Sequence, residues 1–393
     1  MERDELYSGK LIYVDNAASS WPKPRSVIKA MCDFMEKACA NPGRSGHRMS
    51  IEASRILYNT RNELSDLLNV RDPLRVVFCS NATEALNLAL KGLITEKDHV
   101  ITTALEHNSV MRPLRELENS GAQISILKCS QDGIPQAQDL ENLIRKNTKL
   151  VVINHGSNVT GAIAPLSEIG KITRDAGLLL LVDAAQTAGC FPIDFERDQI
   201  DLLAFTGHKS LLGPQGIGGL VIGERVDIER LKPLKTGGTG SRSEYEHQPD
   251  FLPDKYESGT PNTVGVAGIL AGVQFVKKRS VESIREHEMK LTGVLIEGFE
   301  KTGGVRVYGP KSLEKRIGIV SINIDGMPPS EVSFCLDREF GILTRPGLHC
   351  APLAHKTIGA FPQGTVRFSP GVFNTEEEMT TIIEAVCQIA RRG

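Results

Sequence analysis

The sequence lacks any stretch of about 18 consecutive uncharged apolar residues, so we expect no membrane-spanning helix and no membrane partner. Its first ten residues, MERDELYSGK, carry charges of both signs and lack an apolar segment. They do not read as a signal peptide, and we therefore expect a cytoplasmic protein. The chain also lacks a basic excess, with 46 Lys and Arg against 48 Asp and Glu, which argues against nucleic acid as a partner.

None of the eight cysteines forms a C-x-x-C pair. In a chain without a secretion signal, we expect these thiols to be reduced. His349, Cys350 and His355 lie close together in the sequence, but no second cysteine pair completes a metal site with them. We therefore expect no bound metal.

What the sequence does contain is a regular alternation of apolar runs and helical segments, beginning near residue 75. The apolar runs lie at residues 75–79, 99–104, 123–128, 149–155, 178–184, 201–206 and 218–223. Continuous apolar strands that alternate with helices predict an α/β fold with a mainly parallel sheet, covered on both faces. Ligands of such sheets bind beyond the carboxyl ends of the strands, so the polar residues that follow each run are the candidate site residues.

The composition changes after a long polar segment rich in Gly and Pro, residues 236–262. This segment is either a flexible linker or a functional loop, because long irregular segments in compact proteins are often functional. Beyond it, helices are predicted at 264–278, 329–341 and 376–392, and strands at 317–324 and 365–369. This part of the chain predicts a smaller α+β domain.

The first apolar run leads into the segment SNATEALN. Asn81 can cap the following helix, and Glu84 can complete a capping-box-like pair. The backbone amides of Ala82 and Thr83, with the Thr83 hydroxyl, then face outward at the positive end of the helix and form a candidate phosphate site. The alternative is a plain helix cap with nothing bound.

Three further polar residues follow apolar runs. Asp183 ends the run LLLLVD, and a carboxylate at the end of a buried strand needs a partner. A cationic ring nitrogen would be such a partner, and the carboxylate would keep that nitrogen protonated. His107 follows the run at 99–104, and Asn158 follows the run at 149–155. Each of the three residues also has a purely structural interpretation. Asp183 could cap a helix, His107 could be a structural histidine, and Asn158 could be a turn asparagine.

Lys209 follows the run DLLAFT, with Thr206 and His208 beside it. An anion-binding helix end, a flat histidine, a buried carboxylate and a lysine on one sheet edge match the needs of pyridoxal phosphate (PLP). Its aldehyde forms a Schiff base with lysine, its pyridine nitrogen pairs with an aspartate, and its phosphate binds amides and hydroxyls. Lys209 is therefore the candidate Schiff-base lysine.

These segments, taken together, resemble the class V aminotransferase-fold enzymes, and most closely the cysteine desulfurase and selenocysteine lyase group. The motifs that carry the resemblance span nearly the whole chain: VDNAASSWPKP, NPGRSGH, SNATEALN, EHNSV, SNVTGA, VDAAQ, TGHKSLLGPQGIGG, ESGTPN and RPGLHCAPL. The resemblance implies a PLP-dependent transferase of fold type I, with a seven-stranded sheet in its large domain. It also implies a homodimer with active sites at the subunit interface. Residues 15–260 would form the large PLP-binding domain, and residues 1–14 with 261–393 the small α+β domain.

The resemblance also implies roles for individual residues. Lys209 would hold the cofactor and move protons, His107 would stack on the ring and assist acid–base steps, and Asp183 would pair with the ring nitrogen. Gln186 and Asn158 would face the ring oxygen. The residues that would hold the phosphate are Ala82, Thr83, Thr206 and His208, with Thr260 reaching the phosphate of the partner subunit.

Arg367 would bind the substrate carboxylate, because a guanidinium can pair with it through two hydrogen bonds. Arg345 would lie near Arg367, and Asn158 would also contact the substrate. Cys350 matches the catalytic cysteine of the resembling enzymes. Its thiolate would attack the substrate sulfur, releasing L-alanine and leaving a persulfide on Cys350.

The resemblance therefore implies a cysteine desulfurase with L-cysteine as its small-molecule amino-acid substrate. The compact segment 345–350 would hold Cys350 rather fixed, so turnover would depend on a sulfur- or selenium-acceptor protein. Three alternatives remain: a selenocysteine lyase, an aminotransferase and a non-catalytic sulfur-carrier scaffold. An aminotransferase leaves Cys350 unexplained, and a scaffold leaves the lysine, aspartate and histidine set unexplained.

Overall fold

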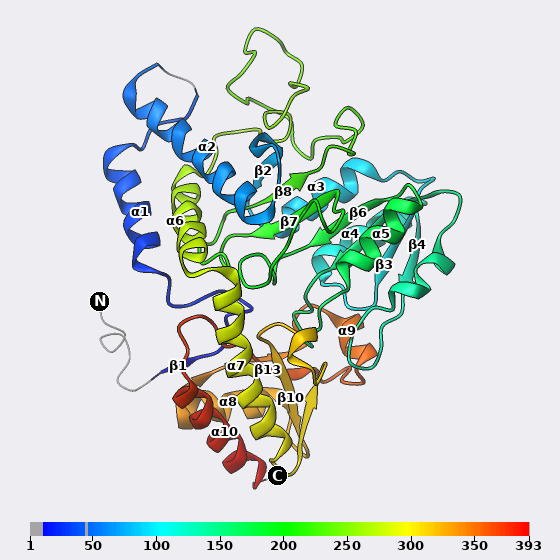
Figure 1. Ribbon diagram of the computed structural model, residues 1–393, viewed down its shortest axis with the longest axis vertical. Helices are drawn as coiled ribbons and strands as arrows, with labels where there is room; N and C mark the ends of the chain where they lie inside the picture. Colours follow the sequence, from blue (N-terminus) through cyan, green and yellow to red (C-terminus); the bar gives the residue numbers. More distant parts are fainter. Residues whose placement is uncertain (1–10, 44–45, 393) are drawn as a thin grey trace.

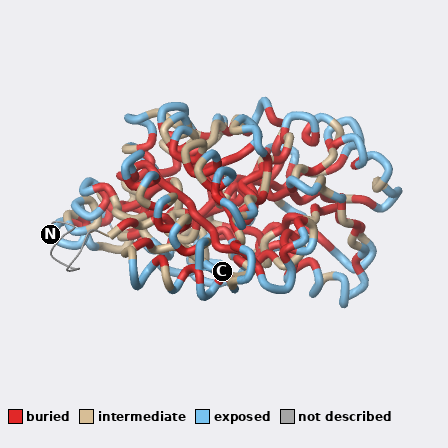
Figure 2. Tube along the Cα trace, turned by 90° about the horizontal axis from the view of Figure 1, so that it is seen from below, coloured by how far each residue is buried: buried red, intermediate tan, exposed pale blue. Residues whose placement is uncertain are grey.

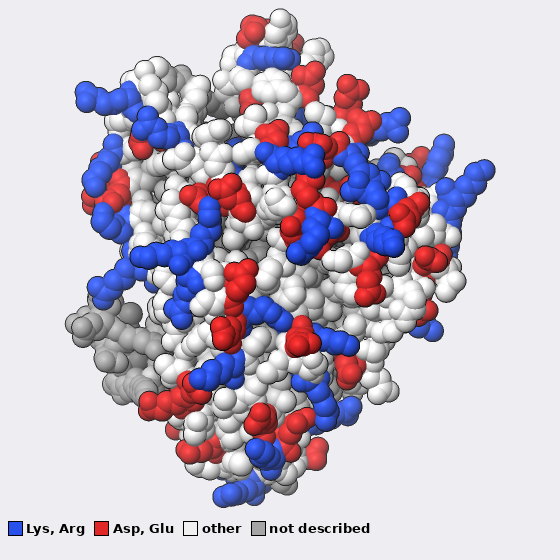
Figure 3. Space-filling view, in the orientation of Figure 1, with Lys and Arg blue, Asp and Glu red and all other residues white. Residues whose placement is uncertain are grey.

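The computed structural model describes residues 11–43 and 46–392. The segment MERDELYSGK, on which the expectation of no signal peptide rests, lies outside the described residues, as do Arg44 and Ser45 of the NPGRSGH motif and Gly393. Across the described ranges, no helix is both long and apolar enough to cross a lipid bilayer. On the face drawn in Figure 3, Lys and Arg side chains are interspersed with Asp and Glu.

A seven-stranded sheet forms the centre of the larger part of the molecule (Figure 1). Its strands, in spatial order, are β2 (Val76–Cys79), β8 (Gly218–Ile222), β7 (Leu202–Thr206), β6 (Leu179–Asp183), β5 (Thr148–Asn154), β3 (His99–Thr103) and β4 (Gln123–Leu127). The strands from β7 to β4 are parallel, and β8 runs antiparallel to both β7 and β2. The predicted α/β fold with a mainly parallel seven-stranded sheet is confirmed.

Helices cover both faces of this sheet because successive side chains of each strand point to opposite faces. On one face, Val152 and Leu181 pack with α3 (Ala82–Leu93) and α4 (Asn108–Asn119). On the other, Val151 and Leu180 pack with α2 (Arg48–Leu68), α5 (Leu166–Asp175) and α6 (Thr263–Arg279). Figure 2 shows the buried backbone of these layers inside an exposed rim.

A second, antiparallel sheet lies in the lower part of Figure 1. Its strands are β12 (Arg345–Gly347), β13 (Thr365–Phe368), β10 (Val320–Ile324) and β9 (Val305–Tyr308), and its helices are α7 (Val281–Glu300), α8 (Pro329–Phe340) and α10 (Glu376–Ala390). The N-terminal segment joins this part, because β1 (Ile12–Tyr13) pairs with β11 (Ile342–Leu343) and Ile12 lies in the same apolar core. The remaining helices are α1 (Arg25–Lys37) and α9 (Pro352–Thr357), with 3-10 turns at Pro73–Arg75, Ala137–Asp139, Glu141–Leu143 and Leu313–Lys315.

The helices and strands expected after residue 262 are present, with small differences at their ends. The expected strand 317–324 begins at Val320, because the amide of Ile317 bonds instead to the carbonyl of Gly161. A domain division at residue 260 stays a prediction. Since Val266 and Ile269 of α6 lie in the core of the large sheet, we propose that the two units meet near Ser280, between α6 and α7.

The long segment 236–262 is irregular, and Glu257 fastens it to the edge of the large sheet. One Glu257 oxygen accepts from the Phe78 amide at 2.6 Å, and the other bonds to Nη2 of Arg61 at 2.7 Å. The Arg61 side chain is 5% exposed and that of Glu257 15%. A buried ion pair of this kind leaves a costly lone charge when one partner is removed.

We expect Glu257→Ala to lower the free energy of unfolding by about 3 kcal/mol, because Arg61 then remains buried without its carboxylate. Urea unfolding followed by circular dichroism measures this. Glu244→Ala, at an exposed position of the same segment, is the matched control and should leave the midpoint unchanged. Equal midpoints for both variants would show that Glu257 does not fasten the segment.

Candidate active site

A cavity that opens to solvent lies at the carboxyl ends of β5, β6 and β7. All the predicted cofactor-binding residues except Thr260 line it: Ala82, Thr83, His107, Asn158, Asp183, Gln186, Thr206, His208 and Lys209. Asn81, Ser109, Asn154 and Ala185 complete its walls. The topology brings these residues together, because parallel strands end at one edge of the sheet.

Lys209 follows β7 and is half-buried. Loss of solvent around its amine lowers the pKa of Lys209 to about 8, while the nearby Asp183 carboxylate acts in the opposite direction. At neutral pH, the amine is therefore mostly protonated, but its neutral fraction is far larger than that of an ordinary lysine. A lysine in this state can act as a nucleophile or carry a proton.

Asp183 ends β6 and is buried. Burial raises the pKa of Asp183, and the hydrogen bond from the Ala185 amide, 3.0 Å from Oδ1, acts in the opposite direction. Lys209 contributes a nearby positive charge, which also acts against the effect of burial. A buried carboxylate with these partners is a binding group for a cation in the cavity.

His107 caps α4 and is held by Ser109. The Ser109 amide donates to Nδ1 of His107 at 3.1 Å, and the Ser109 hydroxyl lies 2.8 Å from the same nitrogen. Nδ1 is therefore the acceptor, and the neutral ring carries its proton on Nε2. Burial, assisted by the charge of Lys209, lowers the pKa of His107 to about 4, so the ring is neutral at pH 7.

Ser109 was missed in the sequence analysis. It stands two residues after His107, where a side chain can bond back to the first turn of the helix. That spacing in EHNSV was the available signal.

The amino end of α3 supplies the candidate anion site. Asn81 caps the helix, with Oδ1 accepting from the Glu84 amide at 2.9 Å. Glu84 does not complete a capping box with Asn81 as expected, because its carboxylate accepts from the Ser80 amide at 2.6 Å instead. The amides of the first helical residues remain without intrahelical acceptors, as at every helix start.

Two buried polar atoms beside this helix end have no hydrogen-bond partner among the described residues. They are Oγ1 of Thr206 and Nδ1 of His208. Buried polar groups are nearly always hydrogen-bonded in folded proteins. Together with the helix amides, these atoms form a set of donors that an anionic ligand would satisfy.

The amides of Gln186 and Asn158 have partners within the protein. Gln186 donates to the carbonyl of Ala17 at 3.0 Å, and Asn158 donates to the carbonyl of His349 at 2.7 Å. Oδ1 of Asn158 is buried and unpartnered among the described residues. Contact of these two side chains with a ring oxygen stays a prediction.

Arg367 and Arg345 lie opposite each other on neighbouring strands, β13 and β12. Arg367 is buried, and its Nη2 pairs with Asp15 at 2.7 Å. Its Nη1 donates to the carbonyl of Asn158 at 3.0 Å, and its Nε has no partner among the described residues. Asp15 was missed in the sequence analysis, although it directly follows the short apolar run LIYV.

Cys350 is exposed, and it lies in a turn beside this cavity. His349 and Cys350 have φ angles of 49° and 56°, a left-handed conformation that is costly for residues with a Cβ. Nε2 of His349 lies 2.9 Å from the carbonyl oxygen of Arg345, and its ring stacks on that of His355 at 5.4 Å. No three His, Cys, Asp or Glu side chains are grouped to hold a metal ion in the described part of the chain.

Thr260 is exposed and lies away from this cavity. It lines a separate hollow with Cys79, Glu84 and Lys235. A role for Thr260 at the phosphate of a partner subunit stays a prediction.

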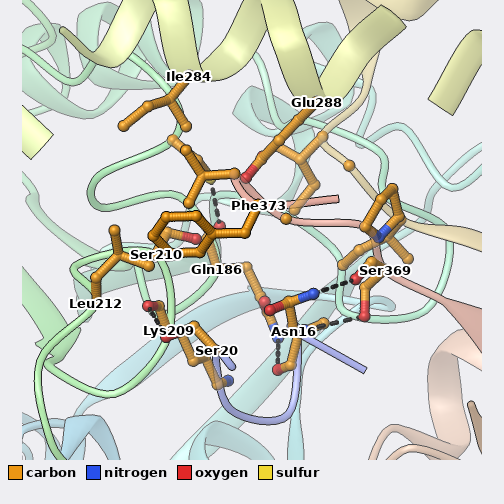
Figure 4. A pocket seen from close by; sticks show the side chains of 18 of the residues that line it. Asn16, Ser20, Gln186, Lys209, Ser210, Leu212, Ile284, Glu288, Ser369 and Phe373 are labelled. Atoms are coloured by element: carbon orange, nitrogen blue, oxygen red, sulfur yellow. Dashed lines mark hydrogen bonds between the residues drawn. The ribbon is translucent and has the colours of Figure 1, made fainter. Parts of the chain in front are cut away.

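A further cavity lies beyond Lys209 and Gln186, which line both hollows (Figure 4). Glu288 reaches into it from α7, opposite Asn16 and Ser369. Burial raises the pKa of Glu288 to about 8, so this carboxyl is largely protonated at neutral pH.

Glu106, which directly precedes His107, is buried beneath the site. Its Oε1 accepts from the Thr103 hydroxyl at 2.6 Å and from the Asn154 amide at 3.0 Å. Burial raises the pKa of Glu106 from 4.5 to about 8. The unfolded chain therefore loses this proton at lower pH than the folded protein does.

We expect the free energy of unfolding of the wild type to fall as the pH rises from 4.5 to about 8, because the unfolded state binds fewer protons than the folded state in this range. Glu106→Gln, which cannot ionise, should gain stability relative to wild type by up to about 1.4 kcal/mol per pH unit. Urea midpoints at pH 5, 6.5 and 8 test this, with the exposed Glu96→Gln as control. An identical pH dependence for wild type and Glu106→Gln would contradict the assignment.

Comparison with known proteins places this chain in a defined group. The Aminotransferase class-V family model matches residues 12–382. A probable cysteine desulfurase from Methanothermobacter thermautotrophicus is 34% identical over 97% of this chain and 95% of its own length. Another from Aeropyrum pernix is 36% identical over 99% of this chain and 96% of its own length.

The fold agrees with these relatives. The apo structure of a cysteine desulfurase from Thermococcus onnurineus NA1 superposes with a TM-score of 0.91 at 34% identity, covering 98% of this chain and 95% of that one. A cysteine desulfurase from Escherichia coli superposes with a TM-score of 0.85 at 26% identity, covering 97% and 95%. The resemblance read from the motifs is confirmed, and the chain belongs to the class-V aminotransferase family.

Proposed function

We propose that this protein is a PLP-dependent cysteine desulfurase, which converts L-cysteine to L-alanine and leaves the sulfur as a persulfide on Cys350. The observation that carries this proposal is the link that Asn158 makes between two chemical centres. A cavity lined by Lys209 and Asp183 lies beside an exposed cysteine, and Asn158 contacts both, lining the cavity and bonding to the cysteine turn. The names of the relatives support the same reaction.

The residues of the cavity fit PLP. The unpartnered Thr206 and His208 atoms and the start of α3 match the donors that a phosphate requires. Buried Asp183 matches a protonated pyridine nitrogen, and Lys209 matches the aldehyde. When bound, PLP supplies an electron sink that makes the bonds of the substrate at Cα and Cβ reactive.

Around that group, the residues of the chain would bind and orient the substrate and move protons. Arg367 would receive the substrate carboxylate through its unpartnered Nε, and Arg345 would add a second positive charge. Asp15 holds the guanidinium of Arg367 in position before substrate binds. Lys209, with its lowered pKa, would take a proton from Cα of the substrate and return one.

His107 would lie against the ring in its neutral form and present Nε2–H. Cys350 would act as a thiolate on the sulfur of the substrate. The S–S bond forms as the Cβ–S bond breaks, and the electron pair of that bond stays with carbon. The carbon then takes up a proton, which completes alanine.

We also propose a homodimer and an acceptor protein for the sulfur. Exposed apolar side chains on α1 and α2 support a subunit interface on that surface: Ile28, Met35, Met49, Ile51 and Tyr58. Thr260, which lies away from its own cavity, would then serve the partner subunit. The exposure of Cys350 supports transfer of its sulfur to another molecule.

We expect Cys350→Ala to lose alanine formation from L-cysteine by on the order of 100-fold or more, because the attacking thiolate is missing. The measurement is steady-state alanine production by the PLP-loaded enzyme. Cys39→Ala, which removes another exposed thiol, is the control and should be fully active.

Activity retained by Cys350→Ala on L-selenocysteine but not on L-cysteine would favour a selenocysteine lyase. Unchanged alanine formation from L-cysteine would refute the role of Cys350 in the reaction.

We expect borohydride treatment of the PLP-loaded protein to fix the cofactor on Lys209, because reduction makes the imine linkage permanent. Peptide mass spectrometry locates the adduct. Lys209→Arg keeps the positive charge and should carry none, while Lys235→Arg, at an exposed position, should be labelled as wild type is. An adduct on any other lysine would overturn the assignment of the cavity.

A further inference from the structure

The turn that carries Cys350 has a backbone that needs support. His349 and Cys350 both have positive φ angles, 49° and 56°, although neither is glycine. Two consecutive non-glycine residues persist in this conformation only where surrounding contacts hold them there. The contacts that hold this turn are therefore part of how the thiol is presented.

Two hydrogen bonds from the large-sheet part of the chain hold the carbonyls of this turn. Nδ2 of Asn158 donates to the carbonyl of His349 at 2.7 Å. The backbone N–H of Asn108 donates to the carbonyl of Cys350 at 2.8 Å. Asn108 is the first residue of α4, so its N–H has no acceptor within the helix and is free for this bond.

Both donors belong to segments that line the candidate cofactor cavity. Asn108 directly follows His107, which lines that cavity. Asn158 also lines it, and its Oδ1 is buried and unpartnered among the described residues. The backbone carbonyl of Asn158 accepts from Nη1 of Arg367 at 3.0 Å.

We propose that the Asn158 side chain and the Asn108 N–H form a clasp on consecutive carbonyls, which positions Cys350 and couples the position of its thiol to occupancy of the cavity. Asn158 and the Asn108 N–H are thus positioning groups. A ligand in the cavity could bond to Oδ1 of Asn158, or it could bond to Arg367, which itself bonds to the Asn158 carbonyl. In both cases Asn158 alone connects the ligand to the carbonyl of His349. The proposal rests on the proposed function, because it assigns the clasp to the cysteine that would receive the sulfur.

The coupling works in both directions, since an interaction between two sites is reciprocal. A ligand in the cavity changes the exposure of the Cys350 thiol. Conversely, release of the turn breaks the hydrogen bond that holds the side chain of Asn158. The bond between Nε2 of His349 and the carbonyl of Arg345 lies within the turn and its own strand. The bond from His349 to Arg345 therefore does not connect the turn to the cavity. The clasp is the connection that the experiments below test.

Asn108→Pro is the sharpest test, because it removes the N–H that the clasp uses, and the loss of the side chain is matched by a control. Proline suits the first position of a helix, where its missing N–H breaks no helical bond. His107, the residue before it, has φ −70° and ψ 157°, which is the conformation that a following proline favours. Asn108→Ala is the matched control, since it removes the side chain and keeps the N–H.

The first measurement is the rate of iodoacetamide alkylation at Cys350 in the PLP-loaded enzyme, read by peptide mass spectrometry. The half-exposed Cys335 on α8, which lies away from the surface proposed as the subunit interface, serves as internal reference. We expect Asn108→Pro to react about fivefold faster at Cys350, the factor that corresponds to one hydrogen bond. Asn108→Ala should react as wild type does. L-alanine as an unreactive ligand should change the rate in wild type, and this change should shrink in Asn108→Pro.

The second measurement separates positioning from general damage. With L-cysteine, Asn108→Pro should show a lower kcat at an unchanged KM, because binding of the substrate is intact and only the thiol is misplaced. With β-chloro-L-alanine, whose chloride leaves without a thiol, turnover should equal that of wild type. A structural defect at the cavity would reduce both reactions.

Alkylation of Asn108→Pro at the wild-type rate, with wild-type kcat, would overturn the proposal. If Asn108→Pro melts well below Asn108→Ala, Asn158→Asp replaces it, because the aspartate keeps the acceptor toward the cavity and loses the donor to His349. Its Cys350 should then be alkylated faster than that of wild type, and an unchanged rate would overturn the clasp. If wild type forms no alanine from L-cysteine while these alkylation differences hold, the proposed function fails and the clasp stands.

Discussion

Asp183 is a carboxylate at the end of a strand whose residues are buried on both faces of the sheet. The residue is only 4% exposed, and the hydrogen bond from the Ala185 amide offsets only part of the cost of burying its charge. The remaining cost is best met by a cation held in the cavity. The site follows from this constraint, because Lys209, His107 and the start of α3 surround the space that such a cation would occupy.

The topology of the sheet supplies that arrangement without any further device. Asp183 pairs with Asn154 on β5 and with Ala204 on β7, so the residues after these strands open onto one hollow. The second sheet contributes the two functional side chains that the first sheet does not carry. Its strand β13 brings Arg367, and the turn after β12 brings Cys350, so the proposed carboxylate receptor and sulfur acceptor come from a different part of the chain.

Much of this could be read from the sequence, because the informative residues stand directly after apolar runs. Asp183 and Lys209 could be predicted in this way, as could the mainly parallel sheet. The pair of Asp15 and Arg367 could not, since the two residues are 352 positions apart and no local pattern joins them. The same holds for the bond from Asn158 to the turn of Cys350, where the donor and acceptor are 191 positions apart. Local spacing predicts which residues end strands, whereas contacts between the two sheets depend on how they pack.

The most direct test of the central claim compares the affinities of PLP and its 1-deaza analogue, which lacks the ring nitrogen, for wild type and Asp183→Asn. If Asp183 holds a protonated ring nitrogen, wild type binds PLP more tightly than the analogue by on the order of tenfold or more, the scale of one buried charged hydrogen bond. Asp183→Asn should then bind the two with nearly equal affinity. Equal affinity for both compounds in wild type would show that the carboxylate serves another purpose and would contradict this account of the site.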